Sequence, residues 1–158
     1  MWFFLQKMAK DPLQLKKEGN EAFAEGDWDK ALSLYTEAIK LTESDSADKA
    51  VLYKNKAAVY LKLSDYQAVI QNCTSSLEIT PNDPKALFRR CQAYEALEKY
   101  EEAYKDVRQA HHYDGNSKAT GPALQRLHDI VQDRVRPRVY WVFSIYIYIY
   151  QYLFQLKS

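Results

Sequence analysis

The chain contains an internal repeat, and this repeat restricts the fold more than any other feature of the sequence. Three 17-residue segments, 25–41, 63–79 and 97–113, align without gaps. Repetition of this kind is typical of stacked arrays, in which each unit buries its apolar face against its neighbours. The aligned columns hold an aromatic residue (Trp28, Tyr66 and Tyr100), then a small or β-branched residue (Ala31, Val69 and Ala103), and then another small residue (Ala38, Ser76 and Ala110).

A second helical segment precedes each aligned segment. In these upstream segments Gly19, Ala57 and Cys91 coincide, and the last two of them are 34 residues apart. The first step is four residues longer because of an insertion in the loop 43–48, where extra residues cost little. Small residues in three columns let two antiparallel helices and the next repeat approach closely. With only 4 Gly and 5 Pro in 158 residues, the sequence predicts an all-α fold of helix–turn–helix units.

The 34-residue period and the small and aromatic columns resemble the tetratricopeptide repeat. The resemblance covers residues 12–116 and implies a right-handed superhelix whose first helices line a concave groove. A further amphipathic segment, 121–134, is expected to cap the last repeat, since Leu124, Leu127 and Ile130 recur at helical spacing. The expected organisation is an N-terminal extension over 1–11 and a repeat domain over 12–134, with repeats at about 12–45, 50–83 and 84–117.

Polar residues on the first helices of the three repeats would face this groove. They are three cations and two amides: Lys16, Asn20, Asn55, Lys85 and Arg89. Lys16 and Asn20 are four residues apart, as are Lys85 and Arg89, so each pair shares one helix face. Asn55 sits in mid-helix, where asparagine is unfavourable unless its amide has a partner. We expect no carboxylate between these groups, so they are suited to a bidentate anion.

These five residues resemble the dicarboxylate clamp of co-chaperones that bind heat-shock proteins 90 and 70. The resemblance implies that they grip the main-chain carboxylate and the last aspartate side chain of a Glu-Glu-Val-Asp tail. It also implies that Phe23, Ala58 and Lys62 contact upstream residues of that peptide. Four neighbouring cations we interpret as solvated rather than as ligand contacts: Lys17, Lys54, Lys56 and Arg90.

Segments 51–63 and 85–110 are most similar to the N-terminal domain of the myosin-folding chaperones that carry a UCS domain. This resemblance implies a cytoplasmic co-chaperone adaptor that is not an enzyme, with myosin held by a downstream domain absent from this chain. Phosphatases, ubiquitin ligases and prolyl isomerases share the clamp, so the chain could also be the repeat fragment of one of these. A tail-anchored membrane receptor for the same chaperones is a further alternative.

Other features of the sequence argue against nucleic-acid binding, metal or cofactor binding, and catalysis. Lys and Arg (22) nearly balance Asp and Glu (21), so the net charge of +1 does not favour nucleic-acid binding. Cys73 and Cys91 lack metal-site spacing and are interpreted as small buried residues of a protein from a reducing compartment. His111 and His112 are interpreted as a solvated helix end, because adjacent helical side chains diverge by about 100°. We therefore expect no metal, no cofactor and no catalytic residue.

Residues 135–158 break with the repeat pattern. Pro137 is predicted to end the preceding helix, and 18 uncharged residues follow over 139–156, flanked by basic residues. Three interpretations compete: a membrane anchor over 139–156, an aggregation-prone strand of alternating Ile and Tyr, and translated non-coding sequence. We favour the third, because an ATATAT repeat encodes alternating Ile and Tyr, and we expect 135–158 to be non-native or disordered. Residues 1–7 are likewise expected to lie upstream of the natural initiator, Met8.

Overall fold

The computed structural model describes residues 11–114 and 118–155, and it describes side chains in these ranges except over 135–144 and 150–155. Within the described residues the chain is helical and contains no strand, so the all-α prediction is confirmed. The residues expected to precede the initiator, 1–7, lie outside the described part. The helices are α2 (Pro12–Glu25), α3 (Trp28–Leu41), α4 (Ala47–Lys62), α5 (Tyr66–Ile79), α6 (Pro84–Ala96), α7 (Tyr100–Tyr113) and α8 (Thr120–Gln155).

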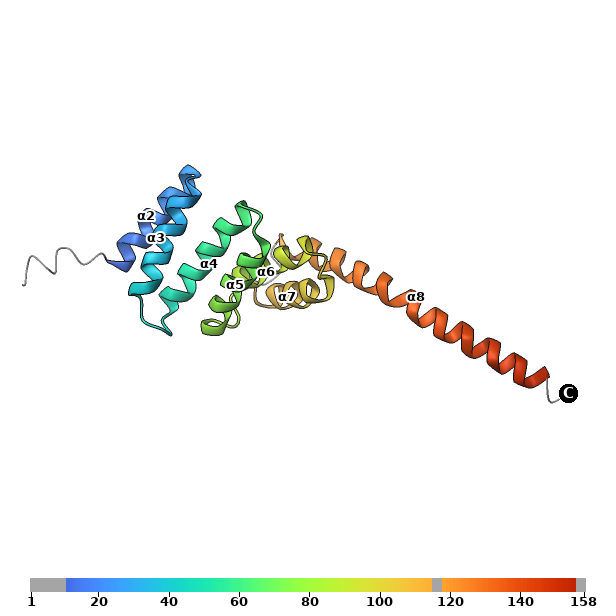
Figure 1. Cartoon of the computed structure of the whole chain (residues 1–158). Coiled ribbons are helices and arrows are strands. Elements are labelled where there is room, and N and C mark those ends of the chain that lie inside the picture. Colours follow the sequence, from blue (N-terminus) through green and yellow to red (C-terminus); the bar gives the residue numbers. More distant parts are fainter. Residues whose placement is uncertain (1–10, 115–117, 156–158) are drawn as a thin grey trace, which may run out of the picture.

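The first six of these helices form three hairpins, α2 with α3, α4 with α5 and α6 with α7 (Figure 1). The second helix of each hairpin begins at the aromatic residue of its repeat: Trp28, Tyr66 or Tyr100. In the first two hairpins an aspartate, Asp27 or Asp65, precedes that aromatic and caps the helix. Its carboxylate accepts a hydrogen bond from a backbone N–H of the first turn, which would otherwise lack a partner.

The small residues of the repeat columns lie where helices touch. The side chains of both small columns in the second helices are fully buried, and so are those of Ala57 and Cys91 in the first helices. At Gly19 a Cβ atom would come within 2.6 Å of Cε1 of Tyr35, so the Tyr35 ring packs directly on the α2 backbone. Close packing of this kind explains why these columns are restricted to small residues.

The hairpins stack in chain order, with α3 packing on α4 and α5 packing on α6. The first helices also meet along one side of the stack, because α2 contacts α4 and α4 contacts α6. This arrangement places the polar faces of three successive first helices next to one another, as the repeat pattern predicted. The right-handed sense of the superhelix stays a prediction.

Helix α8 follows the third repeat and packs against α7. Leu127 and Ala123 bury their side chains beside Val107 and Ala103, which matches the expectation of an apolar face over 121–134. Arg126 adds two hydrogen bonds of 3.0 Å to the carboxylate of Glu95. The start of α8 thus covers the apolar side of the last hairpin.

The prediction that Pro137 ends this helix is wrong, because α8 continues without a break to Gln155. Proline removes one backbone donor from a helix interior, a cost of about 3 kcal/mol, but it does not forbid helical residues on both sides. The far part of α8 projects away from the repeats (Figure 1), and Ile145 to Ile149 are all exposed. No helix in the described part of the chain is both long and apolar enough to cross a membrane. Whether 135–158 is native sequence stays a prediction.

Candidate functional site

The five predicted clamp residues lie on the three adjacent first helices. Lys16 and Asn20 are on α2, Asn55 is on α4, and Lys85 and Arg89 are on α6. Because α4 contacts both α2 and α6, Asn55 occupies the middle of the row. The structure joins the first two helices directly here, since Nδ2 of Asn55 donates a 3.1 Å hydrogen bond to Oδ1 of Asn20.

A buried tyrosine takes part in the same network. The hydroxyl of Tyr35, on α3, donates a 2.7 Å hydrogen bond to Oδ1 of Asn20. Burial raises the pKa of Tyr35 to about 12, although the charge of Arg89 acts in the opposite direction. The hydroxyl therefore keeps its proton at neutral pH. The sequence analysis did not identify Tyr35, because its position in the second helix has no polar signature.

Arg89 is a half-buried cation with no carboxylate paired to it among the described residues. Its Nη1 donates a 3.1 Å hydrogen bond to the backbone carbonyl of Lys54. Burial lowers the pKa of Arg89 from its usual range, an effect that Cys73, Asp83 and Tyr35 oppose. A desolvated guanidinium without a paired carboxylate favours the approach of an anion.

Lys85 lies one turn before Arg89 and is exposed. It is near the N-terminus of α6, where its backbone N–H is bound by the carboxylate of Asp83 at 2.9 Å. Within the described residues its ammonium group has no ion-pair partner. Lys85 and Arg89 therefore present two positive charges at the third helix of the row.

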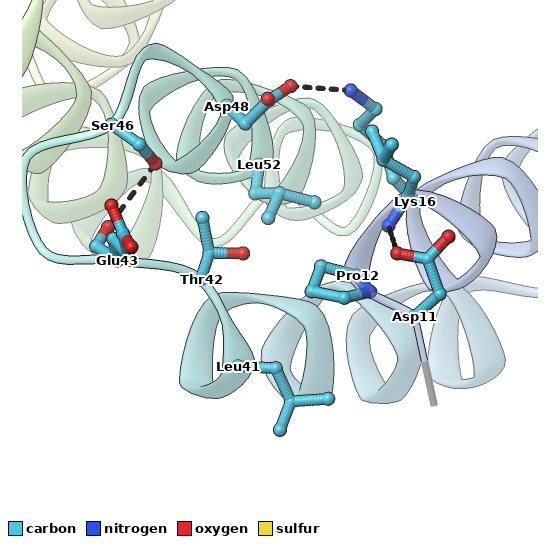
Figure 2. A pocket seen from close by; sticks show the side chains of 10 residues that line it. Asp11, Pro12, Lys16, Leu41, Thr42, Glu43, Ser46, Asp48 and Leu52 are labelled. Carbon is cyan, nitrogen blue, oxygen red and sulfur yellow. Dashed lines mark hydrogen bonds and ion pairs between the residues drawn. The ribbon is translucent and has the colours of Figure 1, made fainter. Parts of the chain in front are cut away.

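The expectation that no carboxylate lies among the clamp residues is wrong. Nζ of Lys16 forms an ion pair of 2.8 Å with Oδ1 of Asp48, at the start of α4 (Figure 2). Asp48 comes from the inserted loop region, so the repeat register alone does not place it opposite Lys16. The side chain of Lys16 is 24% exposed and that of Asp48 is 59% exposed, so the pair is accessible to a competing ligand.

The same ion pair borders a cavity of about 280 Å³ between α2, the end of α3 and the start of α4 (Figure 2). Pro12, Leu41, Thr42 and Leu52 line it together with residues of the loop that joins α3 to α4. Lys16 thus lies at the edge of the clamp that is nearest this cavity.

The interpretation of the neighbouring cations as solvated holds for Lys17, which is exposed, but not for the other three. Arg90 forms a two-pronged ion pair with Asp106 at 2.7 and 2.8 Å and also donates to Oγ1 of Thr74 at 3.1 Å. Lys54 pairs with Asp83. Lys56 is half-buried, and burial together with the charge of Lys40 lowers its pKa. Asp106 and Thr74 lie on other helices and Asp83 directly precedes α6, so the local sequence could not indicate these partners.

The secondary contact residues lie farther along α2 and α4. Phe23 is half-buried against Trp28, with ring centroids 5.3 Å apart in an edge-to-face arrangement. Ala58 is half-buried, and Lys62 is exposed at the C-terminal end of α4. Within the described residues no hydrogen bond or ion pair joins the side chains of these three residues to those of the clamp, so their role as peptide contacts stays a prediction.

The two cysteines are buried in the fold, and the adjacent His111 and His112 lie in the last turn of α7. Cys73 and Cys91 are fully buried, and burial raises the pKa of each thiol to about 12, which keeps both protonated. His112 is exposed, whereas His111 is half-buried and its Nδ1 lies 3.0 Å from Oγ1 of Thr120, so only His112 fits the expected solvated end. The described residues contain no group of three or more potential metal ligands.

Comparison with known proteins identifies the repeat. No family model matches the chain. The chain is 36% identical to the solved Arabidopsis OM64 TPR domain, with a TM-score of 0.69 and coverage of 75% of this chain and 94% of that one. This chain belongs to the tetratricopeptide-repeat (TPR) family.

Two further TPR structures are similar. One is the crystal structure of the myosin chaperone UNC-45 from C. elegans in complex with an Hsp90 peptide, with a TM-score of 0.74, 37% identity and coverage of 81% of this chain and 14% of that one. The other is the first TPR of Spaghetti (RPAP3) bound to the HSP90 peptide SRMEEVD, with a TM-score of 0.71, 27% identity and coverage of 77% of this chain and 96% of that one.

A curated relative, protein unc-45 homolog B of Xenopus laevis, is 39% identical over 126 residues. The match includes 80% of this TPR chain but only 14% of the relative. The chain therefore corresponds to one region of this much longer relative.

Proposed function

We propose that this chain is a co-chaperone adaptor that binds the acidic C-terminal tail of heat-shock protein 90, heat-shock protein 70 or both. Lys16, Asn20, Asn55, Lys85 and Arg89 are proposed to hold the terminal carboxylate and the last aspartate side chain of that tail. The observation that carries the proposal is the half-buried guanidinium of Arg89, which has no paired carboxylate among the described residues. A ligand carboxylate would supply the missing negative charge.

The similarity to peptide-bound TPR structures gives independent support. The UNC-45 structure contains an Hsp90 peptide, and the Spaghetti structure contains a peptide that ends in Glu-Glu-Val-Asp. The chain spans only 14% of the similar unc-45 homolog B, so a role in myosin folding would require residues outside this chain. The buried free cysteines agree with a cytoplasmic location, because free thiols are typical of reducing compartments.

The proposed contacts are charge-assisted hydrogen bonds worth about 1.5–3 kcal/mol each. After the cost of ordering a short peptide is included, we expect micromolar affinity, about −8 kcal/mol. The contacts are ionic and near the surface, so salt should weaken them.

Calorimetric titration of the full chain with the peptide Met-Glu-Glu-Val-Asp tests the proposal. We expect micromolar binding that weakens between low and high salt and is lost in Lys85→Ala. Lys17→Ala is a matched control, because Lys17 is an exposed lysine on α2 outside the clamp. Absence of binding, or equal loss in both variants, would contradict the proposed site.

A further inference from the structure

Tyr35 is the one residue outside the first helices that contacts a clamp side chain through a hydrogen bond within the described part of the chain. Its hydroxyl donates to Oδ1 of Asn20 at 2.7 Å, and its side chain is only 1% exposed. The contact crosses from α3 to α2 and so links the second helix of the first repeat to the row of clamp residues.

The two hydrogen bonds to Asn20 determine which end of its side-chain amide is available to a ligand. An amide oxygen has two lone pairs, and Oδ1 of Asn20 receives one donor from Tyr35 and one from Asn55. Both acceptor positions are therefore used within the protein. The NH₂ group of Asn20, which is an exposed residue, remains to serve a ligand, and it can only donate.

The position of the Tyr35 hydroxyl is itself fixed by packing. Its ring lies against the α2 backbone at Gly19, where even a single added carbon atom would be 2.6 Å from Cε1. The buried ring is packed against this backbone, and its hydroxyl is directed toward Asn20. Burial raises the pKa of the phenol to about 12, so it acts as a donor at neutral pH.

We propose that Tyr35 is a positioning residue that fixes the amide of Asn20 with its nitrogen toward the ligand, so that the site selects a carboxylate over a carboxamide. The inference rests on the proposed function. A carboxylate has only acceptors and matches a donor held in this orientation. A carboxamide also needs an acceptor, which Asn20 could offer only by rotating and breaking its bonds to Tyr35 and Asn55.

The test uses Tyr35→Phe in the full chain, since this change removes the hydroxyl and keeps the ring against Gly19. We expect the affinity for Met-Glu-Glu-Val-Asp to fall about three- to tenfold, the effect of one hydrogen bond. Binding of the C-terminally amidated peptide should stay unchanged or improve, so the ratio of the two affinities should shrink. Tyr66→Phe is the matched control, because it removes a half-buried tyrosine hydroxyl from the corresponding helix of the second repeat.

A double-mutant cycle with Asn20→Ala separates positioning from general stability. If Tyr35 acts through Asn20, Tyr35→Phe should have no effect on peptide affinity once Asn20 is alanine. Equal losses for both peptides, or the same loss in the Asn20→Ala background, would overturn the inference and leave the proposed function intact. Failure of the unsubstituted chain to bind the free-acid peptide would instead overturn both.

If Tyr35→Phe does not fold, NMR of the unsubstituted chain provides the test. Addition of the free-acid peptide should shift the side-chain amide protons of Asn20, because they donate to the ligand. Signals that do not move while the peptide binds would overturn the inference.

Discussion

Arg89 and Arg90 are adjacent in sequence but have different partners, which allows binding and stability to be separated. Among the described residues, the side chain of Arg89 donates one hydrogen bond, to a backbone carbonyl, whereas Arg90 holds the buried carboxylate of Asp106 with two hydrogen bonds. We expect Arg89→Ala to abolish most peptide binding with little change in stability. Arg90→Ala should do the reverse.

The magnitudes follow from these contacts. Loss of one charge-assisted hydrogen bond to a ligand carboxylate costs about 1.5–3 kcal/mol, so Arg89→Ala should weaken binding by about ten- to a hundredfold. The side chains of Arg90 and Asp106 are 19% and 8% exposed, so Arg90→Ala leaves a buried unpaired charge. Such a change costs about 3 kcal/mol or more, which corresponds to a fall in melting temperature of about 6–12 °C.

Thermal unfolding by circular dichroism and calorimetric titration with Met-Glu-Glu-Val-Asp, both on the full chain, measure the two effects. The titrations are run well below the melting temperature of either variant, so that both proteins are folded. Unchanged affinity in Arg89→Ala would refute the clamp. If folded Arg90→Ala lost binding as severely as Arg89→Ala, the separation of the two roles would be refuted instead.

Three further predictions concern other residues. Asp48→Asn should raise peptide affinity by up to about fivefold, because an exposed ion pair worth about 0.2–1 kcal/mol no longer competes for Lys16. Weaker binding in calorimetry would show that Asp48 helps the ligand. Gly19→Ala should lower the free energy of unfolding in urea by about 1–2 kcal/mol, since overpacking against Tyr35 exceeds the gain in helix propensity; a more stable variant would contradict that packing. Burial alone would raise the pKa of Asp83, but hydrogen bonds from the Lys54 side chain and two backbone amides hold it below its usual value. Asp83→Asn should therefore be less stable than the unsubstituted chain above about pH 4, and this difference in stability should vanish as the pH falls further. Thermal melts of both proteins from pH 3 to 7 measure it. A difference in melting temperature that stays constant with pH would show that the charge of the carboxylate is unimportant.

Much of the fold could be predicted because the residue types in the repeat columns indicate where helices pack against one another. The aromatic column coincides with the first residue of α3, α5 and α7, and the small columns are buried at helix contacts. The end of α8 could not be predicted in this way. Pro137 disfavours a helix locally, but the backbone on both sides of it is helical, so one lost hydrogen bond did not terminate the element.

The candidate site could be predicted only at the level of which helices carry it. Asn20 and Asn55 are joined as their register suggested, yet the bond from Tyr35 comes from α3, which carries none of the five predicted clamp residues. Asp48 and Asp106 pair with cations 32 and 16 residues away in sequence. Such contacts depend on how hairpins pack, and no local spacing in the sequence encodes them.

The most direct test of the central claim compares two peptides that differ at one group. Calorimetric titration of the full chain with Met-Glu-Glu-Val-Asp and with its C-terminally amidated twin isolates recognition of the terminal carboxylate. The account predicts micromolar binding of the free acid and at least tenfold weaker binding of the amide. Equal affinity for both peptides would contradict a carboxylate clamp formed by Lys16, Asn20, Asn55, Lys85 and Arg89.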